Sequence, residues 1–344
     1  MSKTHIDLNG RTILVTGSPG FIGANLVMRL RRELTSGTVI SFDNLNDYYD
    51  PELKEYRLRI INAISSPVRH VFVKGSIADK ALVDEIFRTY KPSIVVNLAA
   101  QAGVRYSIDH PDVYIESNLI GFYNILEACR HSYDDGSTGV EHLVYASSSS
   151  VYGGNKKVPF AVEDKVDNPV SLYAATKKSN ELMAHAYSKL YNIPSTGLRF
   201  FTVYGPAGRP DMAYFGFTDK LRQGKTIQIF NYGHCKRDFT YIDDIDGHNT
   251  HGLKYADSNG NEIELVGWRN LMERIGYSIF FNLAPLYSNK QVYTAKSLVS
   301  HYNFDSNMYQ LYYNPNAIST PESWNAAHWR QTTLAEYIKL MTTT

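Results

Sequence analysis

The chain has 344 residues, of which 43% are hydrophobic and 20% are charged, and its formal net charge is +1. These values are ordinary for a globular protein with one large or two smaller domains. The near-neutral charge argues against a nucleic-acid or an acidic-membrane partner, which normally shows as a basic excess. Because "MSKTHIDLNG" has no apolar core and no stretch reaches 18 apolar residues, we expect a cytoplasmic protein without a membrane span.

Short β-branched or apolar runs alternate with helical patterns through the first two hundred residues. Strands are predicted at 11–17, 38–43, 69–75, 93–100 and 141–148. Helices are predicted at 21–34, 80–90 and 118–132. Near-continuous apolar strands separated by helices are typical of an α/β fold of the Rossmann type, a doubly wound parallel sheet covered on both faces.

The pattern loosens after about residue 200, where "GPAGRPDMAYFGF" is rich in Gly, Pro and aromatic residues. We therefore expect a first domain at 1–198, with a return of the chain around 236–250, and a smaller lobe at 199–344. Late in that lobe, 280–284 is compatible with a strand and 322–341 fits a terminal helix.

Metal and disulfide sites are not indicated. The two cysteines, Cys129 and Cys235, are too few for a disulfide framework or a thiolate site. His248 and His251 lie in a polar stretch, where solvated histidines are more common than metal ligands. The sequence therefore predicts no metal.

A glycine-rich turn follows the first strand, with Gly17, Gly20 and Gly23 in "LVTGSPGFIG". Glycines in such a turn let the backbone approach a pyrophosphate at the N-terminus of the next helix. The second strand ends at Asp43, whose carboxylate can accept hydrogen bonds from a ribose and would repel a 2′-phosphate. Since Asn44 follows and no arginine is there to bind that phosphate, NAD is favoured over NADP.

Tyr173 and Lys177 are four residues apart in a helical pattern, so both lie on one helix face. A phenol titrates near 10 and becomes a useful base when neighbouring positive charges lower its pKa. Ser148 lies at the end of a predicted strand, at the sheet edge where ligands bind. These three residues beside a nicotinamide ring predict hydride transfer at an alcohol carbon.

Several motifs together resemble the extended short-chain dehydrogenase/reductase family. They are the glycine triplet, "NLAAQAGVRYS", "SSSSVYGG", "YAATK", "RFFTVYGP" and "RDFTYIDDI". Within the family, "DNLNDYYD", "GPAGRPDMAYFGF" and "FNYGHCKRDFTYIDD" are similar to UDP-glucuronate 4-epimerases. The resemblance runs from about residue 10 to residue 245.

This resemblance implies a tightly held NAD and reversal of the C4 configuration of a UDP-hexuronic acid through a 4-keto intermediate. Tyr173 would take the proton of the 4-hydroxyl, Ser148 would share its hydrogen bond, and Lys177 would hold Tyr173 and the nicotinamide ribose. A homodimer through helices near 110–130 and 173–190 is also implied. The cofactor-binding residues would be Gly17, Gly20, Phe21, Ile22, Gly23, Asp43, Asn44, Ser76, Ile77, Leu98, Ala99, Ala100, Tyr173 and Lys177. The substrate-binding residues would be Arg105, Ser149, Ser150, Thr202, Arg209 and Arg237.

Related activities differ at single positions. Dehydratases of the family carry an Asp–Glu pair where this chain has Ser149 and Ser150, and related decarboxylases carry a glutamate at Ser150. UDP-glucose 4-epimerases usually carry asparagine at Thr202. Hydroxyl donors here and the charge of Arg209 suit a substrate carboxylate. An epimerase for neutral UDP-hexoses, a decarboxylase and a NAD-binding protein without turnover stay open as alternatives.

Three departures from the family pattern bear on these expectations. Ser76 replaces the usual aspartate that contacts adenine, and Pro19 removes one backbone donor from the glycine loop. From about residue 246 the usual segments are not recognisable, which puts nucleotide binding by the second lobe in doubt.

Overall fold

A computed structural model describes residues 7–157, 159–228 and 239–246 and five short strands of the remaining chain. The chain divides into two compact units. Among the described residues, the first unit holds 7–209 and 239–246, and the second begins at Pro210. The domain boundaries expected from the sequence stay a prediction.

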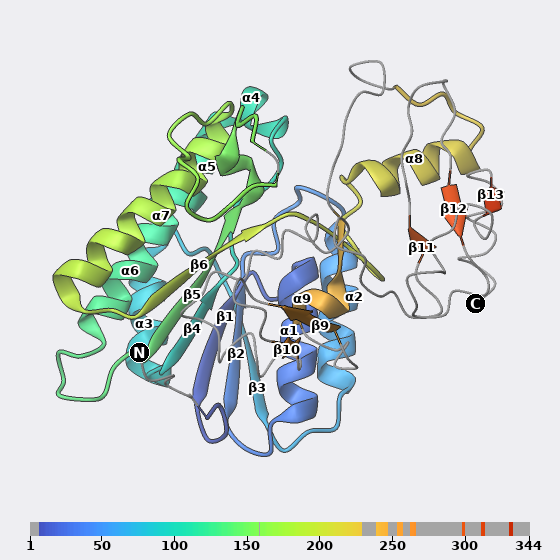
Figure 1. Cartoon of the computed structure of the whole chain (residues 1–344). Coiled ribbons are helices and arrows are strands. Elements are labelled where there is room, and N and C mark those ends of the chain that lie inside the picture. Colours follow the sequence, from blue (N-terminus) through green and yellow to red (C-terminus); the bar gives the residue numbers. More distant parts are fainter. Residues whose placement is uncertain are drawn as a thin grey trace. The chain divides into compact units, whose positions relative to one another are not determined.

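A parallel sheet with the strand order β3-β2-β1-β4-β5-β6 forms the centre of the first unit (Figure 1). Its strands are β1 (Thr12–Thr16), β2 (Thr38–Asp43), β3 (Arg69–Lys74), β4 (Ile94–Asn97), β5 (His142–Ser148) and β6 (Ser195–Phe200). The order reverses between β1 and β4, and ligands of open α/β sheets bind at the carboxyl ends of strands beside such a reversal. The predicted Rossmann-type fold is confirmed.

Helices cover both faces of this sheet (Figure 1). One face carries α1 (Phe21–Glu33) and α2 (Pro51–Ala63), and the other carries α3 (Lys80–Tyr90), α6 (Phe122–His131) and α7 (Leu172–Tyr191). Each face has its own apolar core, one around Val15, Val27 and Ile61 and one around Leu14 and Leu126. A strand buried on both faces therefore reads as a continuous apolar run.

A bent helical segment connects β4 to the outer helices. It consists of α4 (Tyr106–Asp109), α5 (Pro111–Tyr114), the π-helix η1 (Ile115–Gly121) and then α6. The widened turn leaves the carbonyl of Asn118 within 2.6 Å of the side-chain amide of Asn180 on α7. The π-helix therefore fixes this segment to the helix that carries Tyr173.

A smaller parallel pair adds to the first unit beyond β6. It is formed by β7 (Thr202–Tyr204) and β8 (Phe239–Tyr241), which leads into α9 (Ile242–Asp246). Ile242 packs with Phe21 and Val203 in a small core. Residues from beyond position 238 thus support the first turn of α1.

Local signals explain where the functional helices begin. The side chain of Asp50 accepts a hydrogen bond from the amide of Glu52, and Pro51 occupies the first turn of α2. The hydroxyl of Ser171 accepts a bond from the amide of Ala174, 3.1 Å away, and starts α7. Tyr173 is thereby held in the first turn of α7.

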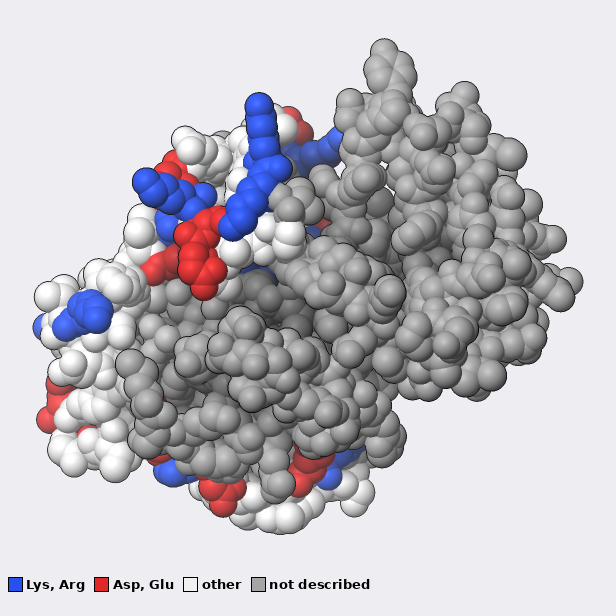
Figure 2. Space-filling view, in the orientation of Figure 1, with Lys and Arg blue, Asp and Glu red and all other residues white. Residues whose placement is uncertain are grey.

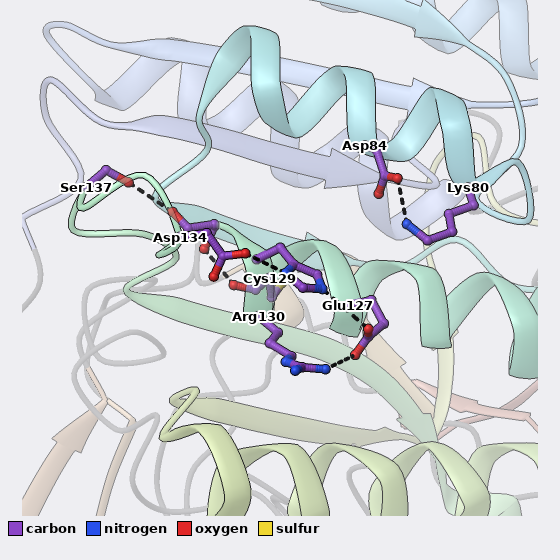
Figure 3. A network of polar contacts seen from close by, with 9 residues as sticks. Lys80, Asp84, Glu127, Cys129, Arg130, Asp134 and Ser137 are labelled. Carbon is purple, nitrogen blue, oxygen red and sulfur yellow. Dashed lines mark hydrogen bonds and ion pairs between the residues drawn. The ribbon is translucent and has the colours of Figure 1, made fainter.

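A polar network surrounds the end of α6 (Figure 3), and further contacts connect it to α7. Glu127 on α6 accepts hydrogen bonds from Arg130 at 3.5 Å and from the hydroxyl of Tyr187 at 2.6 Å. The guanidinium of Arg130 also lies 4.3 Å from the ring centre of Tyr191. Polar and cation–π contacts therefore add to the apolar packing of these helices.

The described surface in Figure 2 carries Lys and Arg side chains interspersed with Asp and Glu. Within the described residues, every helix is too short or too polar to cross a bilayer.

The second unit contains α8 (Ala213–Arg222) and small strand pairings. Strands β11 (Leu298–Val299), β12 (Leu311–Tyr313) and β13 (Arg330–Thr332) pair in that order, and β9 (Leu253–Ala256) pairs with β10 (Glu262–Leu265). The predicted terminal helix is wrong at Arg330–Thr332, because pairing with β12 overrides the local helical pattern. The possible strand at 280–284 lies outside the described residues.

Candidate active site

The glycine turn between β1 and α1 brings backbone close to backbone. Gly17 has a φ of +68°, and a Cβ atom there would lie 2.6 Å from the amide nitrogen of Ala99. A Cβ on Gly23 would lie 2.3 Å from the carbonyl oxygen of Gly17. These two positions therefore require glycine, and the turn presents the N-terminus of α1, with Phe21 and Ile22 in its first turn, at the sheet edge.

A second observation, the unpartnered hydroxyl of Ser18, also indicates that this turn binds a phosphate group. Ser18 is fully buried, and its hydroxyl has no hydrogen-bond partner among the described residues. A buried hydroxyl without a partner is costly unless a ligand supplies one. A pyrophosphate on this turn would offer the missing acceptor.

Asp43, at the end of β2, already has partners. Its Oδ1 accepts a hydrogen bond from the amide of Leu45 at 2.7 Å and lies 3.7 Å from the ammonium nitrogen of Lys54. Burial raises the pKa of Asp43, and the charge of Lys54 opposes that rise. Since both contacts use Oδ1, Oδ2 is the atom that would accept from a ribose hydroxyl. Asn44 follows directly and accepts a bond from the amide of Asn46 at 3.0 Å.

The other predicted cofactor residues follow the neighbouring strands. The amides of Leu98 and Ala99, after β4, donate to Thr16 at 3.2 and 3.1 Å, and Ala100 comes next. After β3, the hydroxyl of Ser76 accepts a bond from the amide of Ala78 at 3.1 Å. The side chain of Asn124 holds the carbonyl of Ile77 at 3.0 Å. These segments lie at the carboxyl ends of β1, β3 and β4.

Tyr173 and Ser148 meet where β5 ends and α7 begins. Burial raises the pKa of Tyr173, while a hydrogen bond with Ser148 and the positive charge of Arg209 lower it. Ser148 also accepts hydrogen bonds from the amide and the hydroxyl of Ser150, at 3.2 and 2.9 Å. The structure therefore gives the phenol a hydroxyl partner and a nearby cation.

Lys177 contacts the neighbouring strand, and its expected roles at Tyr173 and the nicotinamide ribose stay predictions. Its ammonium is buried and donates a 2.9 Å hydrogen bond to the carbonyl of Ala146 on β5. Burial lowers the pKa of Lys177 to about 8. The positive charge that lowers the pKa of Tyr173, against the larger effect of burial, is that of Arg209.

The predicted substrate residues lie on four segments. Ser149 begins the 3-10 helix η2 (Ser149–Tyr152), Thr202 begins β7, and Arg105 is exposed at the start of α4. Arg209 lies close enough for its charge to act on both Tyr173 and Tyr114. Arg237, like Cys235, His248 and His251, lies outside the described residues.

The sequence analysis missed Asn118, which braces the strand end next to the site. Its Oδ1 accepts a 2.8 Å bond from the amide of Gln101, and its Nδ2 donates to the carbonyl of Gln101 and to the hydroxyl of Thr176, both at 3.1 Å. The available signal was an asparagine in the middle of the apolar helical pattern "ESNLIGF". A buried polar residue at such a position must have hydrogen-bond partners.

A buried ion pair behind Ser148 was also missed. Glu181, two turns beyond Tyr173 on α7, accepts two bonds from the guanidinium of Arg199 on β6, at 2.8 and 3.0 Å. The same carboxylate accepts a 2.7 Å bond from the hydroxyl of Ser147. This bidentate pair ties α7 to β5 and β6 and so fixes the spacing between Tyr173 and Ser148.

Several known proteins are similar to this chain. The model of the NAD dependent epimerase/dehydratase family matches residues 13–261. The chain is 52% identical over 233 residues to Protein CapI of Staphylococcus aureus, and the match spans 68% of this chain and 66% of that protein. It is 50% identical over 240 residues to UDP-glucuronate 4-epimerase 4 of Arabidopsis thaliana, spanning 69% of this chain and 52% of the plant protein.

A solved structure with a bound sugar nucleotide is also similar. It is the UDP-glucuronic acid 4-epimerase of Bacillus cereus in complex with UDP-glucuronic acid and NAD. The TM-score is 0.61 at 32% identity, and the match covers 74% of this chain and 75% of that one. The glycine turn, the unpartnered Ser18 hydroxyl and this likeness together identify NAD as the cofactor.

Proposed function

This chain belongs to the NAD dependent epimerase/dehydratase family, and we propose that it converts UDP-glucuronate to UDP-galacturonate through a 4-keto intermediate. The observation that carries the proposal is that Ser148, at the end of β5, and Tyr173, in the first turn of α7, share the sheet edge with the glycine turn and its unpartnered Ser18 hydroxyl. The positive charge of Arg209 lowers the pKa of that phenol, against the rise that burial causes. A base for the sugar hydroxyl and a cation for a carboxylate then lie in one site.

The proton of the sugar 4-hydroxyl passes to Tyr173. The hydroxyl of Ser148 holds the same oxygen and so aligns the proton with the phenol. NAD, which the glycine turn and Asp43 would hold, would supply the acceptor for the C4 hydride and the donor for its return to the opposite face of the ketone. Burial raises the pKa of Tyr173, and the hydrogen bond with Ser148 and the charge of Arg209 oppose that rise.

The carboxylate must survive this oxidation. A 4-keto hexuronic acid is a β-keto acid, and it loses carbon dioxide when the C5–C6 bond aligns with the ketone π system. Arg209, Thr202 and the hydroxyls of Ser149 and Ser150 are the donors that we assign to holding the carboxylate out of that alignment.

The alternatives differ in these same donors. Dehydration requires an acid beside Ser148, and this chain has Ser149 and Ser150 there. A decarboxylase would allow the alignment that an epimerase prevents. A neutral-hexose epimerase would bind a sugar without a carboxylate for Arg209 to hold, and a NAD-binding protein without turnover would have no use for Tyr173.

The test is product analysis after incubation of the purified chain with UDP-glucuronate. UDP-galacturonate supports the proposal, a UDP-pentose selects decarboxylation, and turnover of UDP-glucose alone selects a hexose epimerase. Absence of any product, with NAD still bound, selects the protein without turnover.

A homodimer is part of the proposal. The helices expected to mediate it expose large apolar side chains, among them Ile120 on η1, Tyr123 on α6, and Leu182 and Leu190 on α7. We assign a second copy of the chain as their partner because the exposed residues lie on the two elements that would pair. Light scattering should give twice the mass of one chain, and Leu182→Glu with Leu190→Glu should reduce it to one.

A further inference from the structure

Arg57, on the inner face of α2, is a buried cation to which neither the sequence pattern nor the proposed reaction assigns a role. Its side chain is 2% exposed. Its nitrogens donate five hydrogen bonds to three segments that are far apart in the sequence. A guanidinium has five N–H groups in one plane, so this set uses its full donor capacity.

One edge of the guanidinium holds the cofactor turn. Nη1 donates to the carbonyl of Pro19 at 2.9 Å, inside the glycine turn, and to the hydroxyl of Tyr49 at 2.8 Å. The ring of Tyr49 also lies under the guanidinium carbon at 5.6 Å. Pro19, which donates no amide bond, still contributes its carbonyl to this contact.

The other edge holds the loop that leads to Arg209. Nε and Nη2 donate to the carbonyl of Ala207 at 3.1 and 2.7 Å, and Nη2 donates to that of Gly208 at 3.3 Å. Ala207 has a φ of +53°, a left-handed conformation that is unfavourable for a residue with a Cβ. The contacts with Arg57 hold the residue in that conformation, two positions before Arg209.

We propose that Arg57 is a positioning residue that fixes Arg209 over the substrate by tying the 205–208 loop to the cofactor turn. A lysine places its three donors on one nitrogen, whereas the planar fork of arginine sets the distance between both loops. The inference rests on the proposed function for the role of Arg209. The geometry of the loop itself can be tested independently of the substrate.

The variant is Arg57→Lys, which keeps the charge and loses the fork. The matched control is Arg31→Lys, since Arg31 is likewise buried and donates to a backbone carbonyl, that of Ile61, away from the 205–208 loop. Hydrogen exchange of the full chain is followed in peptides that span 203–212. The amide of Gly208 bonds to the carbonyl of Gly205 at 3.1 Å and reports on the loop.

We expect faster exchange of this loop in Arg57→Lys and no change in Arg31→Lys. Unchanged exchange in Arg57→Lys would overturn the proposal, whatever the substrate proves to be. If Arg57→Lys does not fold, Tyr49→Phe removes a hydroxyl that holds the guanidinium and should show a smaller increase in the same peptides.

Kinetics then separate positioning of Arg209 from a general effect. Arg57→Lys should raise the KM for UDP-glucuronate about tenfold, the factor that corresponds to one weakened charge-assisted hydrogen bond. In an Arg209→Met background the same substitution should add no further increase. An equal increase in both backgrounds contradicts the proposal. If the unmodified chain does not turn over UDP-glucuronate, the proposed function fails, and the exchange measurement still decides the role of Arg57.

Discussion

Asn118 makes with its side chain the two hydrogen bonds to Gln101 that a neighbouring strand would make with its backbone. Its Oδ1 accepts from the amide of Gln101 at 2.8 Å, and its Nδ2 donates to the carbonyl of Gln101 at 3.1 Å. Gln101 follows β4 at the edge where the glycine turn and Tyr173 lie. The side chain of Asn118 therefore holds the backbone just after β4 in place, where no strand among the described residues bonds to it.

Asn118→Leu should unfold at lower denaturant concentration, because both backbone groups of Gln101 lose a buried partner. Each unsatisfied group costs about 1–3 kcal/mol of unfolding free energy. Asn118→Asp keeps the acceptor for the amide of Gln101, and its stability should lie between those of Asn118→Leu and the unmodified chain. Equal stability of Asn118→Leu and the unmodified chain would show that the bracing is not needed.

Tyr173→Phe should lower turnover by a factor on the order of 10²–10⁴, since it removes only the proton acceptor. NAD should stay bound, as measured by nucleotide released on denaturation. Tyr187→Phe, on the same helix but bonded to Glu127, is the matched control and should keep its activity. Substantial activity in Tyr173→Phe would assign the proton transfer to another group.

Lys177→Met should be inactive and yet resist heat better than the unmodified chain at pH 7. Burial lowers the pKa of Lys177 from 10.5 to about 8. At pH 7 the ammonium is therefore less stable in the folded chain than in the unfolded chain, and its burial destabilises the fold. Removing it should raise the free energy of unfolding by up to about 3 kcal/mol, less the lost bond to Ala146. By the same linkage, the unmodified chain should gain stability as the pH rises from 8 to 10.5. A falling melting temperature in that range would contradict the assignment.

His142 should make the fold sensitive to acid. It is buried, its Nε2 lies 3.0 Å from the hydroxyl of Thr196, and burial lowers its pKa from 6.5 to about 4. The unfolded chain binds a proton first, so stability present above pH 6.5 is lost as the pH falls towards 4. His142→Gln should reduce the slope of the free energy of unfolding against pH, between pH 4 and 6.5, by up to about 1.4 kcal/mol per pH unit. An unchanged slope would mean that other groups, such as His70, dominate.

Thr202→Ala or Arg209→His should divert the reaction rather than only slow it. If these side chains hold the substrate carboxylate, each substitution lets the C5–C6 bond align with the ketone and raises the carbon dioxide released per UDP-galacturonate formed. The control is Thr218→Ala, whose hydroxyl bonds within α8 to the carbonyl of Tyr214. A constant ratio at reduced activity would limit Thr202 and Arg209 to binding.

The elements that sequence predicted well are those that local pattern determines. The β-branched run at 38–43 and the amphipathic run at 80–90 coincide with β2 and α3. Helix α2 was not predicted, although Asp50 and Pro51 are typical of a helix start. The strand at 330–332 depends on a partner far along the chain, and no local pattern could reveal it.

The site divides in the same way. Spacing placed Tyr173 and Lys177 on one helix face, but it could not show that Lys177 bonds to Ala146 or that the charge of Arg209 lowers the pKa of Tyr173. Arg209 lies in a loop beyond β7, far from Tyr173 in the sequence, so the spacing within one helix carries no information about it. The side chains of Arg57 and Asn118 bond to backbone groups that only the folded chain brings near them, so the spacing of residues in the sequence could not predict these contacts.

The π-helix makes the number of residues in this segment as important as their identity. Removal of a single residue from Ile115–Gly121 would let the chain wind as a regular α-helix, and every residue on one side of the cut would rotate by about 100° relative to the other. Asn118 would then turn away from Gln101, and Asn180 would lose its acceptor. A one-residue deletion here should therefore be more harmful than almost any substitution, whereas the turn at Asp134–Gly139, whose side chains are mostly exposed, should tolerate changes in length.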